Sequence, residues 1–229
     1  MFTLRDDFHS VLSGTELERF QIEGVRHYRK EGSDVAYPSV TSVLSFINAP
    51  KFADWRRRVG EEAANKKTKH ATTRGTRLHT LFEHFLNNED ITGLKEWEVP
   101  LVNLMFRAAK PQLEKHVDNI FQQETQMSSD RLCLAGTVDL ICEWDGELAV
   151  VDFKTSEKTK PEAWLEGYFV QLSAYWAMFS EKTGLVPKKL VVFLVTEAGE
   201  VQIVERTNIM HYLKKLREYV NQFNQSQNA

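Results

Sequence analysis

Three charged side chains beside one tight turn have the residue types of a metal-dependent hydrolytic site. Asp145-Gly146 is a preferred central pair for a two-residue hairpin turn, and a hairpin centred there places Asp139 directly opposite Asp152. Lys154 follows two residues after Asp152 and therefore lies on the same face. Opposed carboxylates repel each other, and a divalent cation would offset the repulsion while leaving positions open for water and phosphate. The alternative is an exposed face of mixed charge, in which Lys154 pairs with one of the acids.

The other face of the same two strands is apolar. It carries Val138, Leu140, Ala149, Val151 and Phe153. These side chains are expected to enter the core, so the face with the two acids is expected to line a cleft. A bulge in either strand would shift the register and, with it, the pairing of the acids.

Two pairs of polar residues at helical spacing could extend this group. His79 and Glu83 are four residues apart and share one helix face, and an imidazole beside carboxylates favours Mn²⁺ or Mg²⁺ as the ion. Gln171 and Tyr175 are also four residues apart, on the helix that follows Lys154. For each pair the alternative is an ordinary partly buried contact without a chemical role.

One further acid belongs to the strand that precedes Asp139. If that strand ends in a turn at Ser129-Asp130, Glu124 pairs opposite Ala135 and faces the same side as Asp139. A solvated glutamate is the equal alternative.

The elements that must carry these residues follow from the apolar periodicity. The order helix, three antiparallel strands, helix, two strands and helix predicts an α/β sandwich around a mixed sheet. A hairpin around Glu23-Gly24 and a helix start with a hydroxyl N-cap at 38–44 come first, and residues 72–76 are expected to open a second helix. The predicted helices cover 51–69, 77–86, 99–119, 164–180 and 208–223, and the predicted strands cover 120–128, 132–143, 147–155, 189–196 and 200–204.

The charge is unevenly distributed along the chain of 229 residues. The net charge is −3, yet residues 51–79 hold nine Lys or Arg against three acids, a local +6 that leaves −9 on the remainder. A basic patch on an acidic body suits a groove that holds a polyanion, whereas a solvated helix face is the alternative. No run of about 18 apolar residues occurs, which argues against a transmembrane helix, and the N-terminus lacks the apolar stretch of a secretory signal.

Five short motifs then follow one another in the order found in a nuclease family. Together they resemble the RecB-like branch of the PD-(D/E)xK nuclease superfamily, and the stretch 123–158 is also similar to the mitochondrial genome maintenance exonuclease family and its phage relatives. Val138 stands where the proline that names the superfamily would be, a departure that is common in the RecB-like branch. The motifs are Tyr37-Pro38-Ser39-Val40-Thr41, Arg74-Gly75-Thr76 with His79, Gly136-Thr137-Val138-Asp139, Asp152-Phe153-Lys154 and Gln171-x-x-x-Tyr175.

The resemblance implies a fold and a division of the chain. The fold is α/β with a restriction-endonuclease-like core, in which a central mixed β-sheet is flanked by helices beneath an N-terminal helical roof. Residues 1–70 would form a hairpin and a basic helical segment over the active site, residues 71–223 the nuclease core, and residues 224–229 a flexible tail.

The resemblance also implies a role for each candidate residue. The metal would be Mg²⁺ or Mn²⁺, as one or two ions, and the two cysteines make an iron–sulfur cluster unexpected. Glu83 and Glu124 would serve in the second shell or at a second ion. The implied metal ligands are His79, Asp139, Asp152 and the Phe153 backbone carbonyl. The implied catalytic group is Lys154, Asp139, Asp152 and Gln171. The implied DNA contacts are Arg74, Thr76, Tyr175, Arg57, Lys66 and Lys67.

These roles predict a metal-dependent exonuclease that hydrolyses single-stranded DNA from a free end. Phe52 and Trp55 could stack bases beside the basic helix, or they could pack that helix on the core. A non-catalytic module that binds DNA ends and a structure-specific or sequence-specific endonuclease are the alternatives. Replication or recombination proteins are expected partners, no membrane partner is expected, and a reducing, intracellular setting is expected from the cysteine count.

Overall fold

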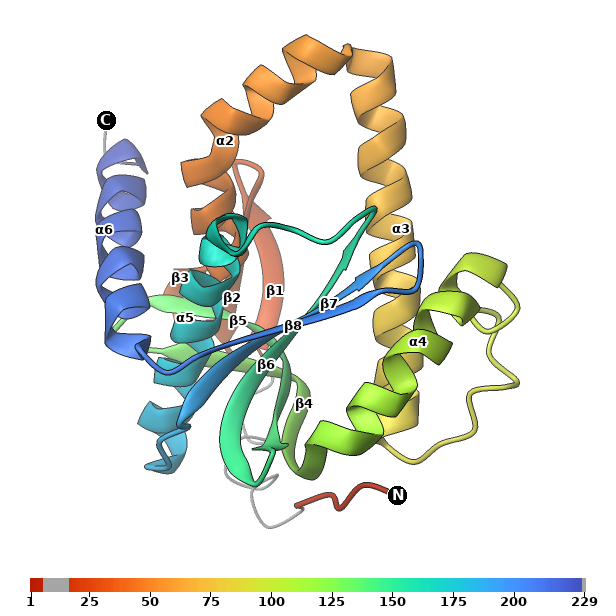
Figure 1. Cartoon of the computed structure of the whole chain (residues 1–229). Helices are drawn as coiled ribbons and strands as arrows, with labels where there is room; N and C mark the ends of the chain where they lie inside the picture. Colours follow the sequence, from red (N-terminus) through yellow and green to blue (C-terminus); the bar gives the residue numbers. More distant parts are fainter. Residues whose placement is uncertain (6–16, 228–229) are drawn as a thin grey trace.

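A five-stranded mixed sheet forms the centre of the computed structural model, which describes residues 1–5 and 17–227 (Figure 1). The strands lie in the order β4-β5-β6-β7-β8; β6 and β7 run parallel and the other neighbours run antiparallel. The predicted mixed sheet is therefore confirmed. The strands are β4 (Val117–Ser129), β5 (Leu134–Trp144), β6 (Glu147–Ser156), β7 (Lys189–Thr196) and β8 (Val201–Arg206).

Helices cover both faces of this sheet. Ile141 and Val150 enter the apolar cluster beneath α5 and α6, whereas their neighbours Leu140 and Val151 enter the cluster beneath α3 and α4. Strands that are buried on both faces read as nearly continuous hydrophobic runs, which is why the apolar pattern here is so dense. The helices that belong to the core are α3 (Glu61–Leu86), α4 (Pro100–His116), the short 3₁₀ helix η1 (Glu162–Leu165), α5 (Glu166–Thr183) and α6 (Ile209–Gln227).

The hairpin between β5 and β6 has the predicted register over most of its length. Asp145-Gly146 forms the turn, with both residues at positive φ (+52° and +74°), and the pairs continue from there to Leu140 opposite Val151. Asp139 and Asp152 come next along the two strands and lie outside the paired ladder.

The pairing of β4 with β5 differs from the prediction. The ladder places Glu124 opposite Asp139, so the predicted partner Ala135 is wrong. The reason is the connection between the two strands, which spans 130–133 rather than a two-residue turn at Ser129-Asp130. In the observed register, the acids Glu124 and Asp139 are opposed on neighbouring strands.

Two long helices meet at Gly60 and form an arch beside the sheet (Figure 1). The first, α2 (Val40–Val59), begins where Ser39 Oγ accepts a 2.9 Å hydrogen bond from the Ser42 backbone N–H, so the predicted hydroxyl N-cap is confirmed. Gly60 has φ +83°, which favours glycine and lets the chain turn into α3. The predicted helix start at 72–76 is wrong because α3 runs through this stretch without a break, and the expected domain boundary at residue 70 lies inside the same helix.

The ends of the chain add smaller elements. A three-stranded antiparallel sheet precedes the arch, and its first turn lies at Glu23-Gly24 as predicted. At the other end α6 continues to Gln227, so residues 224–227 of the expected tail are helical, whereas 228–229 and the N-terminal stretch 6–16 lie outside the described residues. Within the described part of the chain, none of the helices has the length and apolar character needed to cross a membrane. The small sheet consists of β1 (Leu17–Ile22), β2 (Val25–Lys30) and β3 (Ala36–Pro38).

Candidate active site

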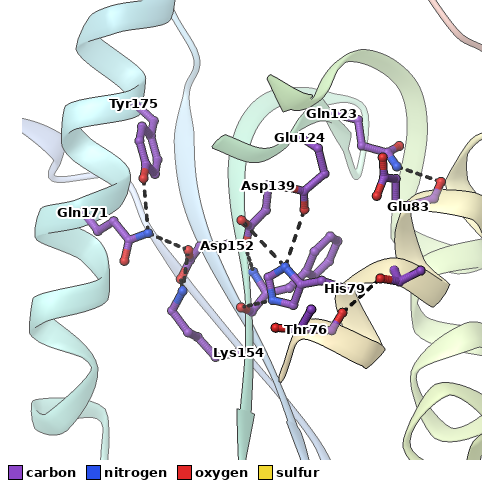
Figure 2. Close-up of polar contacts among 12 residues, drawn as sticks. Thr76, His79, Glu83, Gln123, Glu124, Asp139, Asp152, Lys154, Gln171 and Tyr175 are labelled. Atoms are coloured by element: carbon purple, nitrogen blue, oxygen red, sulfur yellow. Dashed lines mark hydrogen bonds and ion pairs between the residues drawn. The ribbon is translucent and has the colours of Figure 1, made fainter. Parts of the chain in front are cut away.

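Three side chains from three elements converge beside strands β4 and β5 of the sheet (Figure 2). His79 comes from α3, Glu124 from β4 and Asp139 from β5, and we refer to them as the ligand trio. His79 Nδ1 lies 3.5 Å from Glu124 Oε1 and 3.9 Å from Asp139 Oδ1, and one donor atom from each residue lies within 4.8 Å of the other two. Two carboxylates and an imidazole are donors that Mg²⁺ and Mn²⁺ accept, so the trio fits a divalent ion.

Glu124 reaches the trio from an unusual backbone conformation. Its φ is +45°, in the left-handed region that residues other than glycine rarely adopt. The side chain points toward His79 (Figure 2), and the neighbouring Gln123 Nε2 donates a 2.7 Å hydrogen bond to the Glu83 carbonyl oxygen on α3. Backbone strain of this kind persists where surrounding contacts hold it, and it is concentrated at functional sites.

His79 balances the charge of the two acids. Burial would lower the pKa of His79, but the Asp139 charge and the hydrogen bond with Glu124 raise it to about 9. The ring is therefore protonated at neutral pH, and its Nε2 donates a 3.0 Å hydrogen bond to the Phe153 carbonyl oxygen. A divalent ion that binds the ring nitrogen must displace a proton first.

Asp139 and Asp152 follow the last pair of the β5–β6 ladder, and their carboxylates have different partners. Asp139 Oδ2 accepts a 2.8 Å hydrogen bond from the Phe153 backbone N–H, so this side chain occupies the position that a strand carbonyl would take. The carboxylate of Asp152 instead contacts Lys154 and Gln171. The two acids lie on the neighbouring interior strands β5 and β6, but only Asp139 belongs to the ligand trio.

Asp152 is the centre of a second polar group, buried against α5. Lys154 Nζ lies 2.6 Å from its carboxylate oxygens, and Gln171 Nε2 donates a 3.2 Å hydrogen bond to Oδ1 (Figure 2). Only 1% of Asp152 is exposed, and Gln171 of α5 lies against its carboxylate, whereas the Lys154 side chain on the same face keeps 21% of its surface exposed. Burial raises the pKa of Asp152 to about 7, although Lys154 opposes the shift and Asp139 adds to it.

Tyr175 supports this second group from inside the protein. It is 2% exposed, and its hydroxyl accepts a 3.5 Å hydrogen bond from Gln171 Nε2. Burial raises its pKa. The ring packs so closely on Gly136 that a Cβ there would lie 2.9 Å from a ring carbon. The side chain is enclosed in this structure, and the contact of Tyr175 with DNA stays a prediction.

Arg74 forms an ion pair within the fold. Its guanidinium pairs with Glu197 in the turn between β7 and β8, and His70 Nδ1 lies 3.5 Å from the same carboxylate. Arg74 is 5% exposed in this structure, and its predicted phosphate contact stays a prediction. Thr76 is exposed on α3, where its carbonyl oxygen accepts a hydrogen bond from the Thr80 hydroxyl.

The remaining predicted DNA contacts lie on the arch. Arg57, on α2, pairs with Asp54 in the same helix, and Lys66 and Lys67 are exposed on α3. The rings of Phe52 and Trp55 stack on each other with centroids 5.3 Å apart. Phe52 is 47% exposed, so its ring does not serve to pack α2 on the core.

Two acids and an aromatic residue complete the surroundings. Glu83 lies one turn after His79, and burial together with Glu124 raises its pKa, but its carboxylate is not part of the trio. Sequence analysis missed Tyr168, whose ring centroid lies 5.2 Å from Lys154 Nζ. The missed signal is helical spacing: Tyr168 precedes Gln171 by three residues and lies on the same face of α5.

The fold and the site together define the family. The profile of the PD-(D/E)XK nuclease superfamily matches residues 39–228, and the chain belongs to that superfamily. This confirms the resemblance drawn from the five motifs.

Particular relatives add detail. Mitochondrial genome maintenance exonuclease 1 of Homo sapiens is 29% identical over 132 residues, and the Mus musculus protein of the same name is 26% identical over 133. Each match covers 54% of this chain and 38% of the relative, so the chain spans well under half the length of these proteins. A solved structure of a candidate exonuclease from Eubacterium rectale is 16% identical with a TM-score of 0.45, over 66% of this chain and 63% of that one.

Proposed function

We propose that this chain is a metal-dependent DNA exonuclease that hydrolyses phosphodiester bonds of single-stranded DNA from a free end. The observation that carries the proposal is the position of the ligand trio beside the buried pair of Asp152 and Lys154. Superfamily membership supports nuclease chemistry, and the similarity to curated exonucleases supports attack from an end.

The trio and its neighbours offer a suitable set of donors. His79, Glu124 and Asp139 would hold Mg²⁺ or Mn²⁺, and Asp152 and the Phe153 carbonyl oxygen are the further oxygen donors expected from the family resemblance. A bound divalent ion lowers the pKa of a water molecule and offsets charge on a phosphate. Glu83, one turn along α3, would contribute if a second ion binds.

Lys154 is the residue of the site best suited to contact the phosphate. The Lys154 side chain is 21% exposed, whereas the side chain of its partner Asp152 is 1% exposed, so a phosphate oxygen or an attacking water would meet the lysine rather than the acid. Gln171 holds Asp152 in place, and Asp152 orients the ammonium. Charge that develops on the phosphate would be stabilised by a cation fixed in advance.

The arch would guide the strand toward this site. Its exposed cations, which include Arg57, Lys66 and Lys67, suit the sugar-phosphate backbone, and the stacked rings of Phe52 and Trp55 offer a surface for unpaired bases. We therefore assign residues 40–70 to substrate guidance and the sheet with its flanking helices to hydrolysis. Replication or recombination proteins would supply the single strands.

Two other functions are distinguished by specific observations. A module that only holds DNA ends has no need for Glu124 and Asp139 to be opposed across the sheet at a cost in stability. An endonuclease would cut a strand that has no end, whereas an exonuclease would not.

The test compares linear and circular single strands of the same sequence. With Mn²⁺ or Mg²⁺ the linear strand should be degraded from an end and the circular strand should remain intact. EDTA should stop the degradation of the linear strand with either metal. Cleavage of the circle would favour the endonuclease. Binding without cleavage at either metal would favour the end-binding module.

A further inference from the structure

An aromatic ring holds Lys154 in addition to its carboxylate partner. The Lys154 ammonium lies over the ring of Tyr168, with Nζ 5.2 Å from the ring centroid, while the same Nζ lies 2.6 Å from Asp152. A cation over the face of an aromatic ring is attracted by the π electrons. The ammonium therefore has two supports from two different elements, Asp152 on β6 and Tyr168 on α5.

The ring of Tyr168 is held in turn by the segment that follows β6. Lys160 Nζ donates a 2.7 Å hydrogen bond to the Tyr168 hydroxyl oxygen. Both backbone groups of Lys160 are tied to β8: its N–H donates to Gln202 Oε1 at 2.9 Å, and its carbonyl oxygen accepts from Gln202 Nε2 at 2.8 Å. A side-chain amide that satisfies both groups fixes this residue much as a neighbouring strand would.

The two supports of Lys154 respond differently to a cation in the ligand trio. Such a cation would attract the Asp152 carboxylate and repel the Lys154 ammonium. The ion pair between Asp152 and Lys154 would therefore weaken. The ring of Tyr168 carries no net charge, so the cation would not attract it away and the cation–π contact with the ammonium would persist. The aromatic support therefore gains importance in the state that the chemistry requires.

We propose that Tyr168 is a positioning residue for Lys154, with its ring orientation set by Lys160 and Gln202. The inference rests on the proposed function, in which Lys154 acts on the phosphate or on the attacking water. A residue that places a catalytic group without touching substrate should affect kcat and leave KM nearly unchanged.

Three variants separate the ring from the hydroxyl group and from general packing. Tyr168→Leu removes the ring, Tyr168→Phe keeps it, and Tyr219→Leu alters an equally half-buried tyrosine on α6. With linear single-stranded DNA we expect kcat to fall about tenfold in Tyr168→Leu with KM within about twofold, and to fall less in Tyr168→Phe, which keeps the ring but loses the hydrogen bond from Lys160. Unchanged kcat in Tyr168→Leu, or equal losses in the leucine and phenylalanine variants, would overturn the inference.

A second measurement needs neither metal nor catalysis. An amine-acylating reagent is applied to the metal-free protein, and the rate of modification at Lys154 is followed by mass spectrometry, with the exposed Lys67 as the internal reference. Tyr168→Leu should raise the rate at Lys154 several-fold, Tyr168→Phe should raise it less, and Lys67 should react equally in all variants. Equal rates at Lys154 in all variants would overturn the inference. If the wild-type chain cleaves no DNA, the proposed function fails and these rates alone decide the role of Tyr168.

Discussion

Glu124 and Asp139 lie opposite each other on neighbouring antiparallel strands, and both carboxylates lie near the ring of His79. Like charges opposed across a sheet are destabilising, so the arrangement requires a positive charge near them. In the metal-free protein the imidazolium of His79 supplies that charge, and a divalent ion would replace it. The protonation of one histidine therefore links the stability of the fold to the occupancy of the site.

Stability of the metal-free protein should decrease as the pH rises from 6.5 to 9. The pKa of His79 is raised from 6.5 to about 9 in the folded state, so its contribution is complete below 6.5 and is lost through 9. The loss in unfolding free energy should be at most about 3 kcal/mol, measured by urea denaturation in EDTA. His79→Gln should flatten this dependence, and a wild-type protein that is equally stable at pH 6.5 and 9.5 would contradict the assignment.

Replacing Asp139 should weaken both the metal site and catalysis. Asp139→Asn keeps the size of the side chain and its acceptor for the Phe153 N–H, but it removes one charge from the ligand trio. We expect Mn²⁺ affinity, measured by calorimetry, to fall at least about tenfold, and cleavage of single-stranded DNA to fall at least about a hundredfold. Asp118→Asn, at an exposed position of β4, is the matched control and should change neither quantity.

A methyl group at Gly136 should disturb the support of the site. Its Cβ would lie 2.9 Å from a ring carbon of Tyr175, a buried residue with little room to move. Gly136→Ala should lower the unfolding free energy by about 1–3 kcal/mol in urea denaturation. Gly167→Ala on α5 meets no atom within 4 Å and should be neutral or slightly stabilising. Equal effects of the two changes would show that Tyr175 is not packed as described.

The ion pair between Arg74 and Glu197 should fasten α3 to the turn between β7 and β8. Arg74→Met removes the cation and leaves a half-buried carboxylate whose remaining ion-pair partner among the described residues is His70. The expected loss is about 1–3 kcal/mol of unfolding free energy. Arg77→Met, on the exposed side of the same helix, should stay within about 0.5 kcal/mol of the wild type. If Arg74 contacts DNA instead, Arg74→Met would weaken binding without reducing stability.

The affinity of the arch for single strands should depend on salt. Each phosphate contact contributes about −0.7 to the slope of log K against log salt concentration, so Lys66→Gln with Lys67→Gln should reduce the slope by about 1.4. Fluorescence anisotropy with a labelled oligonucleotide measures this slope. The double change Lys188→Gln with Lys214→Gln removes two exposed lysines from other surfaces and should leave the slope unchanged. An unchanged slope in the arch variant would exclude these lysines from the strand path.

Local signals were sufficient to predict a large part of this fold. The Asp145-Gly146 turn sets the β5–β6 register, the Ser39 hydroxyl marks the start of α2, and helical spacing predicts the joint face of Gln171 and Tyr175. Each of these depends on residues a few positions apart, where backbone geometry leaves few choices.

The remaining features depend on contacts that local spacing does not determine. The four-residue connection after β4 shifted the partner of Glu124, and the side chain of Asp139 took a backbone amide in place of a strand carbonyl. The ion pair of Arg74 joins residues 123 positions apart in the chain. Periodicity describes one element at a time, so it could not predict which element would cover Asp152.

Gln202 joins the segment after β6 to β8, and this contact bears on when a newly made chain becomes able to catalyse. All members of the ligand trio, together with Asp152 and Lys154, precede residue 155, yet the loop that steadies the lysine is anchored to the penultimate element of the chain. A nascent chain that has emerged only as far as β7 would contain every charged group of the centre without the strand that steadies its lysine. Full activity should therefore arise only after β8 has joined the sheet.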